Sequence, residues 1–410
     1  MPEKAKVPAI RFKGFTDAWE QRKVTELGNI FIGLVTTMTK NYTTEGTLLI
    51  RNSDIKDNRF EFGRNPIYLE SSFAEKNSTR MHLLGDVITV HTGDVGTSAV
   101  ITENEVNSIG FATIVSRPNP KIIDSKYFAS FLNTDLHKKW AVSISTGDGR
   151  TNYNLGDYKK LVVPLPELDE QKKIAQFIDY LSNLITLHQR KLLKLKNVKK
   201  AMLEKMFPKN GSTVPEIRFA GFTDAWEQRK VGELLIERNE QAPMSDEYPL
   251  MAFIANEGVA PKGERYDRSS LVSDTESKLY KRTESGDFIY SSNNLETGSI
   301  GLNKYGNASI SPVYSVFQPT GIADSDFLGR RLVRKDFINA MVKWRQGVIY
   351  GQWRIHESDF IKIEIPVPSV EEQRKIGAIL DDLDNLITLH QRKYEKLQNL
   401  KKACLEKMFV

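Results

Sequence analysis

The sequence predicts an α+β protein: two mixed α/β domains separated by a long antiparallel two-helix coiled coil, with pseudo-two-fold symmetry. Three observations lead to this fold class. A short segment occurs twice, a long heptad-patterned segment occurs twice, and the two interiors between them are unlike each other and carry short β-type runs. With 410 residues, 40% of them apolar, the chain is long enough to build a core in each of two domains.

The short repeat is nearly perfect. Residues 10–24 return as residues 217–231, with only Lys13 replaced, by Ala220. The interiors that follow, residues 25–163 and 232–365, share almost nothing. Fixed-offset similarity of this kind reveals a repeated architecture. The alternative is an old tandem duplication without functional meaning. In that case, mutations would have accumulated equally in the repeated segments and in the interiors.

The long repeat begins at Pro164-x-Pro166 and at Pro366-x-Pro368 and continues to Phe207 and Phe409. Its apolar residues recur at heptad spacing, which is typical of a coiled-coil seam, and a helix of about 35 residues would measure about 50 Å. The predicted seam consists of Ile174, Leu181, Leu184, His188, Leu195 and Val198 in the first helix, and Ile376, Leu383, Leu386, His390, Leu397 and Leu400 in the second.

The linker between the first helix and the second unit is too short to run back along that helix, because about ten extended residues span at most about 35 Å. The second helix is therefore expected to return antiparallel, with the variable domains at opposite ends of the helix pair. His188 and His390 occupy matching seam positions where leucine would pack better. We interpret them as polar residues that set the register, with a metal-binding or catalytic role as the alternative.

Composition narrows the function classes. The formal net charge is +6 and the pI about 9.0, which suits a polyanionic partner but is a weak signal alone. Cys404 is the only cysteine, so neither a disulfide framework nor a thiolate cluster is expected. The sequence shows no signal peptide and no run of about 18 apolar residues. We expect a cytoplasmic protein without a membrane span.

Polar loops follow Gly-Asp turns in both interiors and recur just before each long helix. They contain the side chains that base edges require, arginine for guanine and asparagine or glutamine for adenine, together with hydroxyls. Ordinary surface loops are the alternative. The candidate DNA-binding residues are Arg51, Asn52, His91, Thr92, Thr97, Arg150, Asn152, Tyr153 and Asn154 in the first interior, and Asn293, Asn294, Thr297, Arg345, Tyr350, Gln352, Trp353 and Arg354 in the second.

Catalytic motifs are missing from the sequence. It contains no Asn/Asp-Pro-Pro-aromatic tetrapeptide of an amino-group methyltransferase and no Gly-x4-Gly-Lys-Ser/Thr phosphate-binding loop. The string from Asp274 to Lys278 lacks the upstream carboxylate that a magnesium-dependent nuclease needs. The six histidines and one cysteine are not at metal-ligand spacing. We therefore predict neither catalytic nor metal-binding residues.

The whole pattern resembles the specificity subunits of type I restriction-modification systems. The resemblance is carried by the Gly-Phe-x3-Trp segments at Gly14 and Gly221, by the Pro-x-Pro-x4-Gln-x2-Ile segments at Pro164 and Pro366, and by the duplicated helices. It implies target-recognition domains at residues 1–166 and 217–368, spacer helices at 167–207 and 369–410, and a linker at 208–216.

The family's function is implied by the same resemblance. Each variable domain would read one half of a split, asymmetric site on double-stranded DNA, and the helices would fix the gap and dock two modification subunits. One helical turn is about 34–36 Å, so half-sites about 10–11 base pairs apart are expected. S-adenosylmethionine, ATP and magnesium would belong to the modification and restriction subunits, and this chain would be non-catalytic. A single-chain restriction-modification enzyme and a coiled-coil scaffold without DNA are the alternatives.

Overall fold

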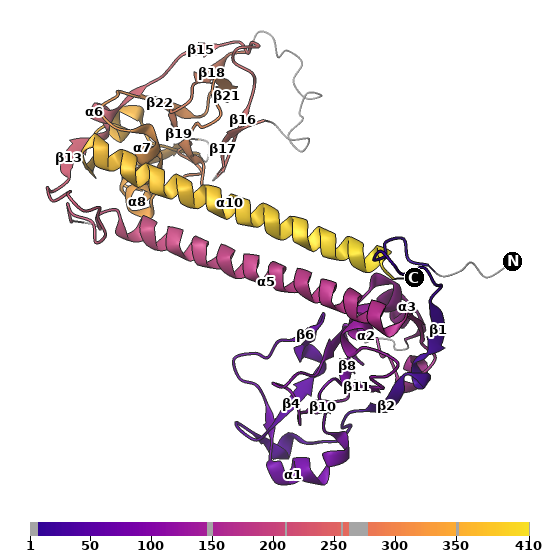
Figure 1. The fold of residues 1–410 in the computed structure, drawn as a ribbon. Helices are drawn as coiled ribbons and strands as arrows, with labels where there is room; N and C mark the ends of the chain where they lie inside the picture. Colours follow the sequence, from indigo (N-terminus) through magenta and orange to yellow (C-terminus); the bar gives the residue numbers. More distant parts are fainter. Residues whose placement is uncertain are drawn as a thin grey trace. The chain divides into compact units, whose positions relative to one another are not determined.

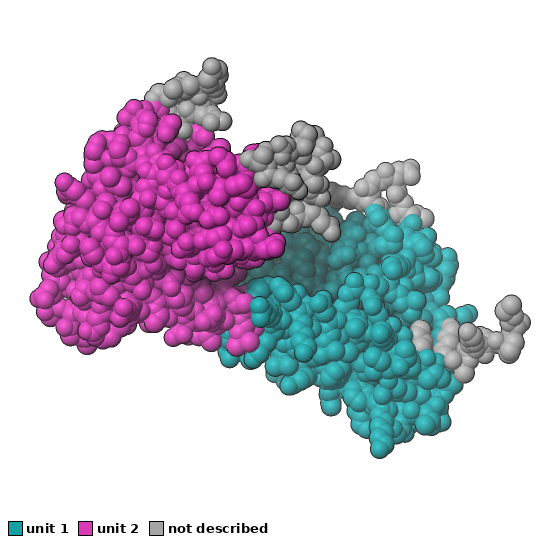
Figure 2. All heavy atoms as spheres, turned by 90° about the horizontal axis from the view of Figure 1, so that it is seen from above, with its two compact units in different colours: residues 1–191, 390–410 teal, residues 192–389 magenta. Residues whose placement is uncertain are grey.

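The computed structural model describes residues 7–145, 151–209, 211–255, 257–261, 278–349 and 352–409. The chain divides into two compact units, residues 1–191 with 390–410 (unit 1) and residues 192–389 (unit 2), which Figure 2 shows in different colours. Each long helix contributes one part to each unit. The two compact units therefore have other boundaries than the domains that the sequence predicts. The predicted domain boundaries stay a prediction.

Unit 1 contains a mixed α/β domain built around two four-stranded sheets (Figure 1). The first has the antiparallel order β2 (Gly28–Ile32), β11 (Ile114–Pro118), β8 (Val87–Thr89), β9 (Ser98–Val100). The second has the order β10 (Ile109–Phe111), β4 (Thr47–Arg51), β7 (Tyr68–Leu69), β3 (Tyr42–Thr43), with β10 parallel to β4. A hairpin of β5 (Ile55–Lys56) and β6 (Arg59–Phe60) follows β4. The helices are α1 (Ser71–Lys76), α2 (Ser125–Leu132), α3 (Asp135–Ile144), α4 (Leu155–Tyr158) and the start of α5 (Leu168–Lys205).

Unit 2 repeats this plan in part. Its four-stranded antiparallel sheet has the order β14 (Leu235–Glu237), β22 (Ser315–Pro319), β19 (Phe288–Tyr290), β20 (Ile300–Leu302). Smaller sheets pair β15 (Gln241–Ala242) with β18 (Tyr280–Thr283) and β21 (Ala308–Ile310), β16 (Ala252–Ile254) with β17 (Gly258–Ala260), and β23 (Gln346–Ile349) with β24 (Gln352–Arg354). The helices are α6 (Val231–Leu234), α7 (Ser325–Leu332), α8 (Lys335–Val342), α9 (Glu357–Phe360) and the start of α10 (Val370–Lys407).

The two interiors thus share a fold that their sequences do not reveal. The order β2-β11-β8-β9 in unit 1 matches β14-β22-β19-β20 in unit 2, and a helix pair, α2 and α3 or α7 and α8, follows the last of these strands in the chain. The β-type runs that the sequence predicts lie in β4, β8, β19 and β22. The strands β8 and β19 are completely buried because their sheet is covered on both faces.

The short repeat forms the same strand pair in both units. β1 (Glu20–Lys23) pairs antiparallel with β12 (Val162–Leu165), and β13 (Glu227–Lys230) pairs antiparallel with β25 (Glu364–Val367). The register is equivalent, since Gln21 faces Pro164 and Gln228 faces Pro366. Each domain is therefore closed by a strand from the short repeat and the strand that leads into its long helix.

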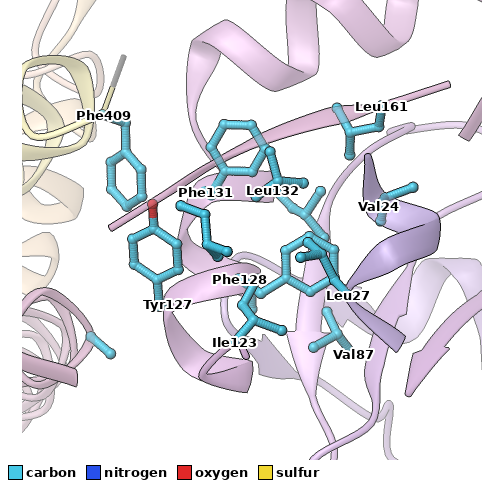
Figure 3. Packing of buried hydrophobic residues seen from close by; sticks show 14 of the residues in the cluster. Val24, Leu27, Val87, Ile123, Tyr127, Phe128, Phe131, Leu132, Leu161 and Phe409 are labelled. Carbon is cyan, nitrogen blue, oxygen red and sulfur yellow. The ribbon is translucent and has the colours of Figure 1, made fainter. Parts of the chain in front are cut away.

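The core of each unit includes the start of one long helix and the end of the other. In unit 1 the side chains of α2 pack with Val24, Leu27 and Leu161, and Phe409 stacks on Tyr127 with ring centroids 5.4 Å apart (Figure 3). In unit 2 Phe207, at the end of α5, stacks on Phe327 at 5.7 Å. The start of α5 shares a core with the end of α10, and the end of α5 shares a core with the start of α10. The two helices therefore run antiparallel, as predicted.

The predicted seam is only partly correct. Ile174, Leu181, Ile376 and Leu383 are buried, and Leu195, Val198 and Leu397 pack against the cores from partly buried positions. The prediction of a buried seam position is wrong for Leu386 and Leu400, because each is 43% exposed. Leu192 and Leu380 are buried instead. A helix with 3.6 residues per turn drifts by about 20° per heptad from a 3.5-residue repeat, so strict heptad spacing does not stay on one face.

His188 and His390 meet within unit 1, with their Nδ1 atoms 2.8 Å apart and both side chains partly buried. One ring must donate and the other accept, so at least one of them is neutral. Burial lowers the pKa of His188, and the neighbouring His390, Lys393 and Lys191 lower it further. The contact is consistent with a polar pair that sets the helix register.

Replacing both histidines by leucine is expected to stabilise unit 1 by about 1–2 kcal/mol at neutral pH, because leucine packs better in a helix seam. Below pH 6.5 the gain should grow, since a lowered His188 pKa means that the unfolded chain binds the proton more readily. Urea unfolding at pH 7.5 and 5.5 measures both effects. The single variant His188→Leu is the control, because it leaves His390 without its partner. Equal stability of wild type and double variant at both pH values would contradict the expectation.

Among the described helices, none is both long and apolar enough to cross a membrane.

Candidate nucleic-acid interface

Three polar loops of unit 1 come together although they lie far apart in the sequence. The Asn52 side-chain oxygen accepts a hydrogen bond from the His91 backbone N–H at 2.8 Å, and His91 Nδ1 lies 2.7 Å from Thr92 Oγ1. The Thr92 hydroxyl donates to Asn152 Oδ1 at 2.9 Å, and the Tyr153 N–H donates to the His91 carbonyl at 2.8 Å. Four sequence-predicted candidates, Asn52, His91, Thr92 and Asn152, therefore form one hydrogen-bonded chain.

These contacts fix the loops against one another. Asn52 also donates through Nδ2 to the carbonyls of Phe111 and Ala112, so it ties the end of β4 to the turn after β10. Ala112 has a φ of 48°, a strained conformation for a residue with a side chain. Burial lowers the pKa of His91, which is therefore neutral at pH 7 and unsuited to pairing with a phosphate. The arrangement presents a preorganised polar surface.

Two candidates in unit 1 are wrong as base-contacting residues. Thr97 is 1% exposed and donates its hydroxyl hydrogen bond to Asp94 at 2.8 Å. Tyr153 has no exposed surface; its ring packs against His137, Trp140 and Tyr158 in the core, and burial raises its pKa. Residue type alone suggested both, but the loop turns these side chains inward.

Two other candidates in unit 1 have structural partners. Asn154 caps α4, since its side-chain oxygen accepts from the Asp157 N–H at 2.9 Å. Arg51 donates through Nε and Nη2 to buried Asp54 at 3.0 and 2.8 Å, and this ion pair orients a guanidinium whose side chain is still 37% exposed. The remaining guanidinium nitrogen, Nη1, is not used by Asp54 and is suited to donate to a guanine edge. Arg150 lies outside the described residues.

The described candidates of unit 2 lie in the loop after β19 and next to the hairpin of β23 and β24. The loop after β19 is closed by the Asn294 N–H donating to the Ser291 carbonyl and by the Thr297 hydroxyl donating to the Asn294 carbonyl. Arg345 joins this loop through two hydrogen bonds to Glu296, at 2.9 and 2.7 Å. Asn293 lies in the same loop and is partly buried.

The hairpin of β23 and β24 also joins the loop after β19, because the Ile355 N–H donates to Ser292 Oγ at 3.1 Å. Arg354 is 67% exposed, at the end of the hairpin. Tyr350 and the side chains of Gln352 and Trp353 lie outside what the structure describes. In unit 1 the loop after β8 thus contacts the segment before the short helix α4. In unit 2 the loop after β19 contacts the segment before the short helix α9.

Each unit contains a buried ion pair that is not among the residues predicted from the sequence. Arg11 donates to both carboxylate oxygens of Glu170 at 2.7 and 2.8 Å, and the Trp19 indole N–H donates to the same carboxylate at 3.1 Å. Arg218 and Glu372 repeat the pair at 2.7 Å for both contacts. The signal was present, because arginine and glutamate recur in both copies of the repeat. The shared motifs therefore hold each domain on its helix.

A glutamine of each long helix strengthens this attachment. Gln171 accepts from the Asp124 N–H at 2.8 Å, and Gln373 accepts from the Asp324 N–H at 2.7 Å. Asp124 and Asp324 are the N-cap residues of α2 and α7, so the same glutamine sets the first helix of each domain against the long helix. These motifs fix the orientation of each domain relative to its long helix.

Comparison with known proteins decides the family. The family model described as type I restriction modification DNA specificity domain matches twice, at residues 16–197 and 224–399. The chain belongs to this family. Both matches include a variable domain and most of the helix that follows it, so the duplication read from the sequence is a duplication of the specificity domain.

Two relatives are type I restriction enzyme specificity subunits, and one of them matches nearly the whole chain. The putative type I restriction enzyme MjaX specificity subunit of Methanocaldococcus jannaschii is 22% identical over 399 residues, which cover 94% of this chain and 92% of the relative. The MjaVIII specificity subunit of the same organism is 25% identical over 308 residues, or 70% of this chain and 69% of the relative.

A solved structure shares the fold. The crystal structure of a type I restriction-modification system S subunit from M. genitalium aligns with a TM-score of 0.58 at 15% identity, over 98% of this chain and 99% of that one. The match extends over both units.

Within the described residues, no group of three or more histidine, cysteine, aspartate or glutamate side chains could hold a metal ion.

Proposed function

We propose that this chain reads a bipartite, asymmetric DNA site within a type I restriction-modification complex, with one half-site bound by each variable domain. One observation carries the proposal. The two units place a polar loop after the equivalent strand of the same sheet, β8 or β19, yet fill it with different side chains, His91 and Thr92 in one and Asn293 and Asn294 in the other. Two domains with the same sheet but different loop side chains are suited to binding two different half-sites.

Docking of two modification subunits on the long helices is part of this proposal. The helices expose apolar side chains, which favour burial by a protein partner. Leu187 is 46% exposed and its duplicate Leu389 is 45% exposed, so each unit offers an equivalent leucine. A duplicated contact residue is suited to two copies of one partner. S-adenosylmethionine, ATP and magnesium would be bound by the partner subunits, and the complex would work on DNA in the cytoplasm.

The methylome of a host that carries this chain, compared with a deletion strain, tests the proposal directly. We expect methylated adenines in a split motif whose halves are centred about 10–11 base pairs apart. Exchanging residues 232–365 for the corresponding interior of another family member should change one half of the motif only. The reciprocal exchange of residues 25–163 is the matched control and should change the other half. A change in both halves after a single exchange would refute separate reading.

The two alternative functions are tested separately. A single-chain restriction-modification enzyme predicts DNA methylation by the purified chain alone, whereas our proposal predicts methylation only with the modification subunits present. A scaffold that does not read DNA predicts no salt-dependent, sequence-specific binding by the assembled complex. Methylation assays and fluorescence anisotropy with the motif found in the methylome distinguish all three.

A further inference from the structure

A groove of about 720 Å³ lies within unit 1, between the β5–β6 hairpin, the end of β9 and the two long helices. It does not include the loops described above. Its charged lining residues are Asp57, Arg59, Glu61, Lys126, Asp179, Arg190 and Lys401, which makes four cations against three carboxylates. The volume is in the range of ordinary ligand sites, about 300–1,000 Å³.

The three carboxylates of this groove already have cationic partners. Asp57 pairs with Lys138 at 2.7 Å, Asp179 pairs with Lys126 at 2.6 Å, and Glu61 pairs with Arg59. Within the part of the chain that the structure describes, Arg190 and Lys401 make neither an ion pair nor a hydrogen bond through their side chains. Two positive charges of the lining are thus left without a carboxylate of their own.

Lys401 is the more unusual of the two because it is partly buried. Burial lowers its pKa, and Arg59 acts in the same direction, while Asp57 and Asp179 oppose the shift from a distance. Lysines rarely leave water without a partner, since loss of solvation disfavours the charged form. An anion in the groove would restore the missing interaction.

The duplicated groove of unit 2 provides an internal comparison. It measures about 400 Å³ and is lined by β20, α7 and the two long helices. The sequence offset between the long helices makes Lys199 the equivalent of Lys401, and Lys199 pairs with Asp384. The residue of the first helix that corresponds to Asp384 is Ser182, which lines the groove of unit 1.

Among the described residues that line the groove of unit 2, each cation has a carboxylate partner. Arg330 pairs with Asp381 and Asp384, and Lys304 pairs with Asp326 at 2.6 Å and with Asp381 at 3.7 Å. One groove therefore contains its own counter-charges, whereas the other lacks a carboxylate at the position that faces its lysine. The two grooves thus differ at one helical position, which is Ser182 in unit 1 and Asp384 in unit 2.

We infer that the groove of unit 1 is an oxyanion-binding site centred on Lys401 and Arg190, and that the oxyanion is a phosphate of the DNA backbone outside the bases that are read. The assignment to DNA rests on the proposed function. A phosphate suits the site because lysine and arginine supply several donors to tetrahedral oxygens, and because phosphates are the anions that a DNA-reading protein always meets. The groove of unit 2 would not bind one, so the DNA contacts outside the bases would be asymmetric.

The oxyanion site itself is tested with inorganic phosphate and the full-length chain. In a sample labelled with ¹³C at the lysine side chains, phosphate should shift the NMR signal of Lys401 and raise its pKa, and should leave Lys199 unchanged. Ser182→Asp supplies the missing carboxylate and should abolish the response. Asp384→Ser removes it from unit 2 and should make Lys199 respond. An unchanged Lys401 signal, or an equal response in Ser182→Asp, would overturn the inference.

The assignment to DNA is tested in the complex with modification subunits and a duplex that carries the methylated motif. Ser182→Asp and Lys401→Gln should each reduce the slope of log affinity against log salt by about 1. Lys402→Gln, on the exposed side of the same helical turn, is the control and should leave the slope unchanged. A phosphate response without any change in slope would refute DNA as the source. Absence of DNA binding by the wild-type complex would instead refute the proposed function, and the phosphate titration would still decide on the site.

Discussion

Lowering the pH from 7 to 4.5 should unfold unit 1 before unit 2. The reason lies in two histidines that are buried in unit 1. Burial and, to a smaller extent, the charge of Arg117 lower the pKa of His82 to about 3, and burial lowers that of His137 to about 4. Hydrogen bonds hold both neutral rings: His82 Nδ1 lies 2.8 Å from Ser108 Oγ, and His137 Nδ1 donates to the Leu132 carbonyl at 2.7 Å.

The sign of the effect follows from proton binding. The folded-state pKa values lie below the value of about 6.5 in the unfolded chain, so the unfolded chain binds more protons below pH 6.5. Stability is therefore complete above pH 6.5 and falls by about 1.4 kcal/mol per pH unit for each histidine as the pH decreases toward the folded pKa. Two histidines remove about 5 kcal/mol by pH 4.5. Unit 2 contains only His356.

The single cysteine gives a probe for this prediction. Cys404 is buried in the core of unit 1, so its reaction with 4,4′-dithiodipyridine, which proceeds in acid, reports the unfolding of that unit. The double variant Cys404→Ala, Met202→Cys places the thiol at the equivalent position of unit 2. We expect the thiol of unit 1 to become reactive at a higher pH than that of unit 2. Equal acid transitions for the two thiols would contradict the assignment to unit 1.

A second set of variants assigns the acid transition to the two histidines themselves. His82→Asn combined with His137→Gln removes both titrating groups, so the stability of this double variant should depend much less on pH between 6.5 and 4.5. The slope against pH is the informative quantity, because either substitution also changes packing in a buried position. An unchanged slope would assign the acid sensitivity to other groups.

Replacing Glu170 by glutamine should cost unit 1 about 3–5 kcal/mol, because the substitution leaves Arg11 without its counter-charge in a largely buried site. The Glu170 side chain is fully buried and that of Arg11 is 12% exposed. Glutamine offers one acceptor oxygen where the carboxylate offers two, and its amino group would face the donors of Arg11. Urea unfolding monitored by the reactivity of Cys404 measures the loss.

The matched variant in unit 2 is Glu372→Gln, which breaks the pair with Arg218. Its effect should be smaller by about 1 kcal/mol, the value of one hydrogen bond. The difference arises at the tryptophans, since Trp19 donates to Glu170 whereas the buried Trp226 indole nitrogen has no partner among the described residues. Glu20→Gln, which disturbs an exposed pair with Arg22, is the control and should cost less than about 1 kcal/mol.

The double variant Arg11→Met, Glu170→Leu separates charge from packing. If the loss in Glu170→Gln comes from an uncompensated buried guanidinium, the apolar pair should recover most of the stability. A double variant no more stable than Glu170→Gln would show that hydrogen-bond geometry, including the contact from Trp19, matters more than the stranded charge.

The candidate site was predicted unevenly. Asn52, His91, Thr92 and Asn152 were selected by residue type and position, and the structure joins them by hydrogen bonds, while their role in DNA binding stays a prediction. The same criteria included Thr97 and Tyr153, which the fold turns inward. Thr97 donates to Asp94, three residues earlier in the same loop, and is buried there. The sequence contains both residues but does not show that the loop folds so that their side chains meet.

The sequence was enough to predict the duplicated frame, the presence of short strands in both interiors, and the antiparallel direction of the helices. Repeats, hydrophobic periodicity and linker length are local properties, so they can be read without knowing what packs against what. Only the tertiary structure decided which seam leucines are buried, that the repeated arginine and glutamate form an ion pair, and that Lys401 lacks the aspartate that Lys199 has. These features depend on residues 150 or more positions apart, whose contacts are set by the packing of whole elements.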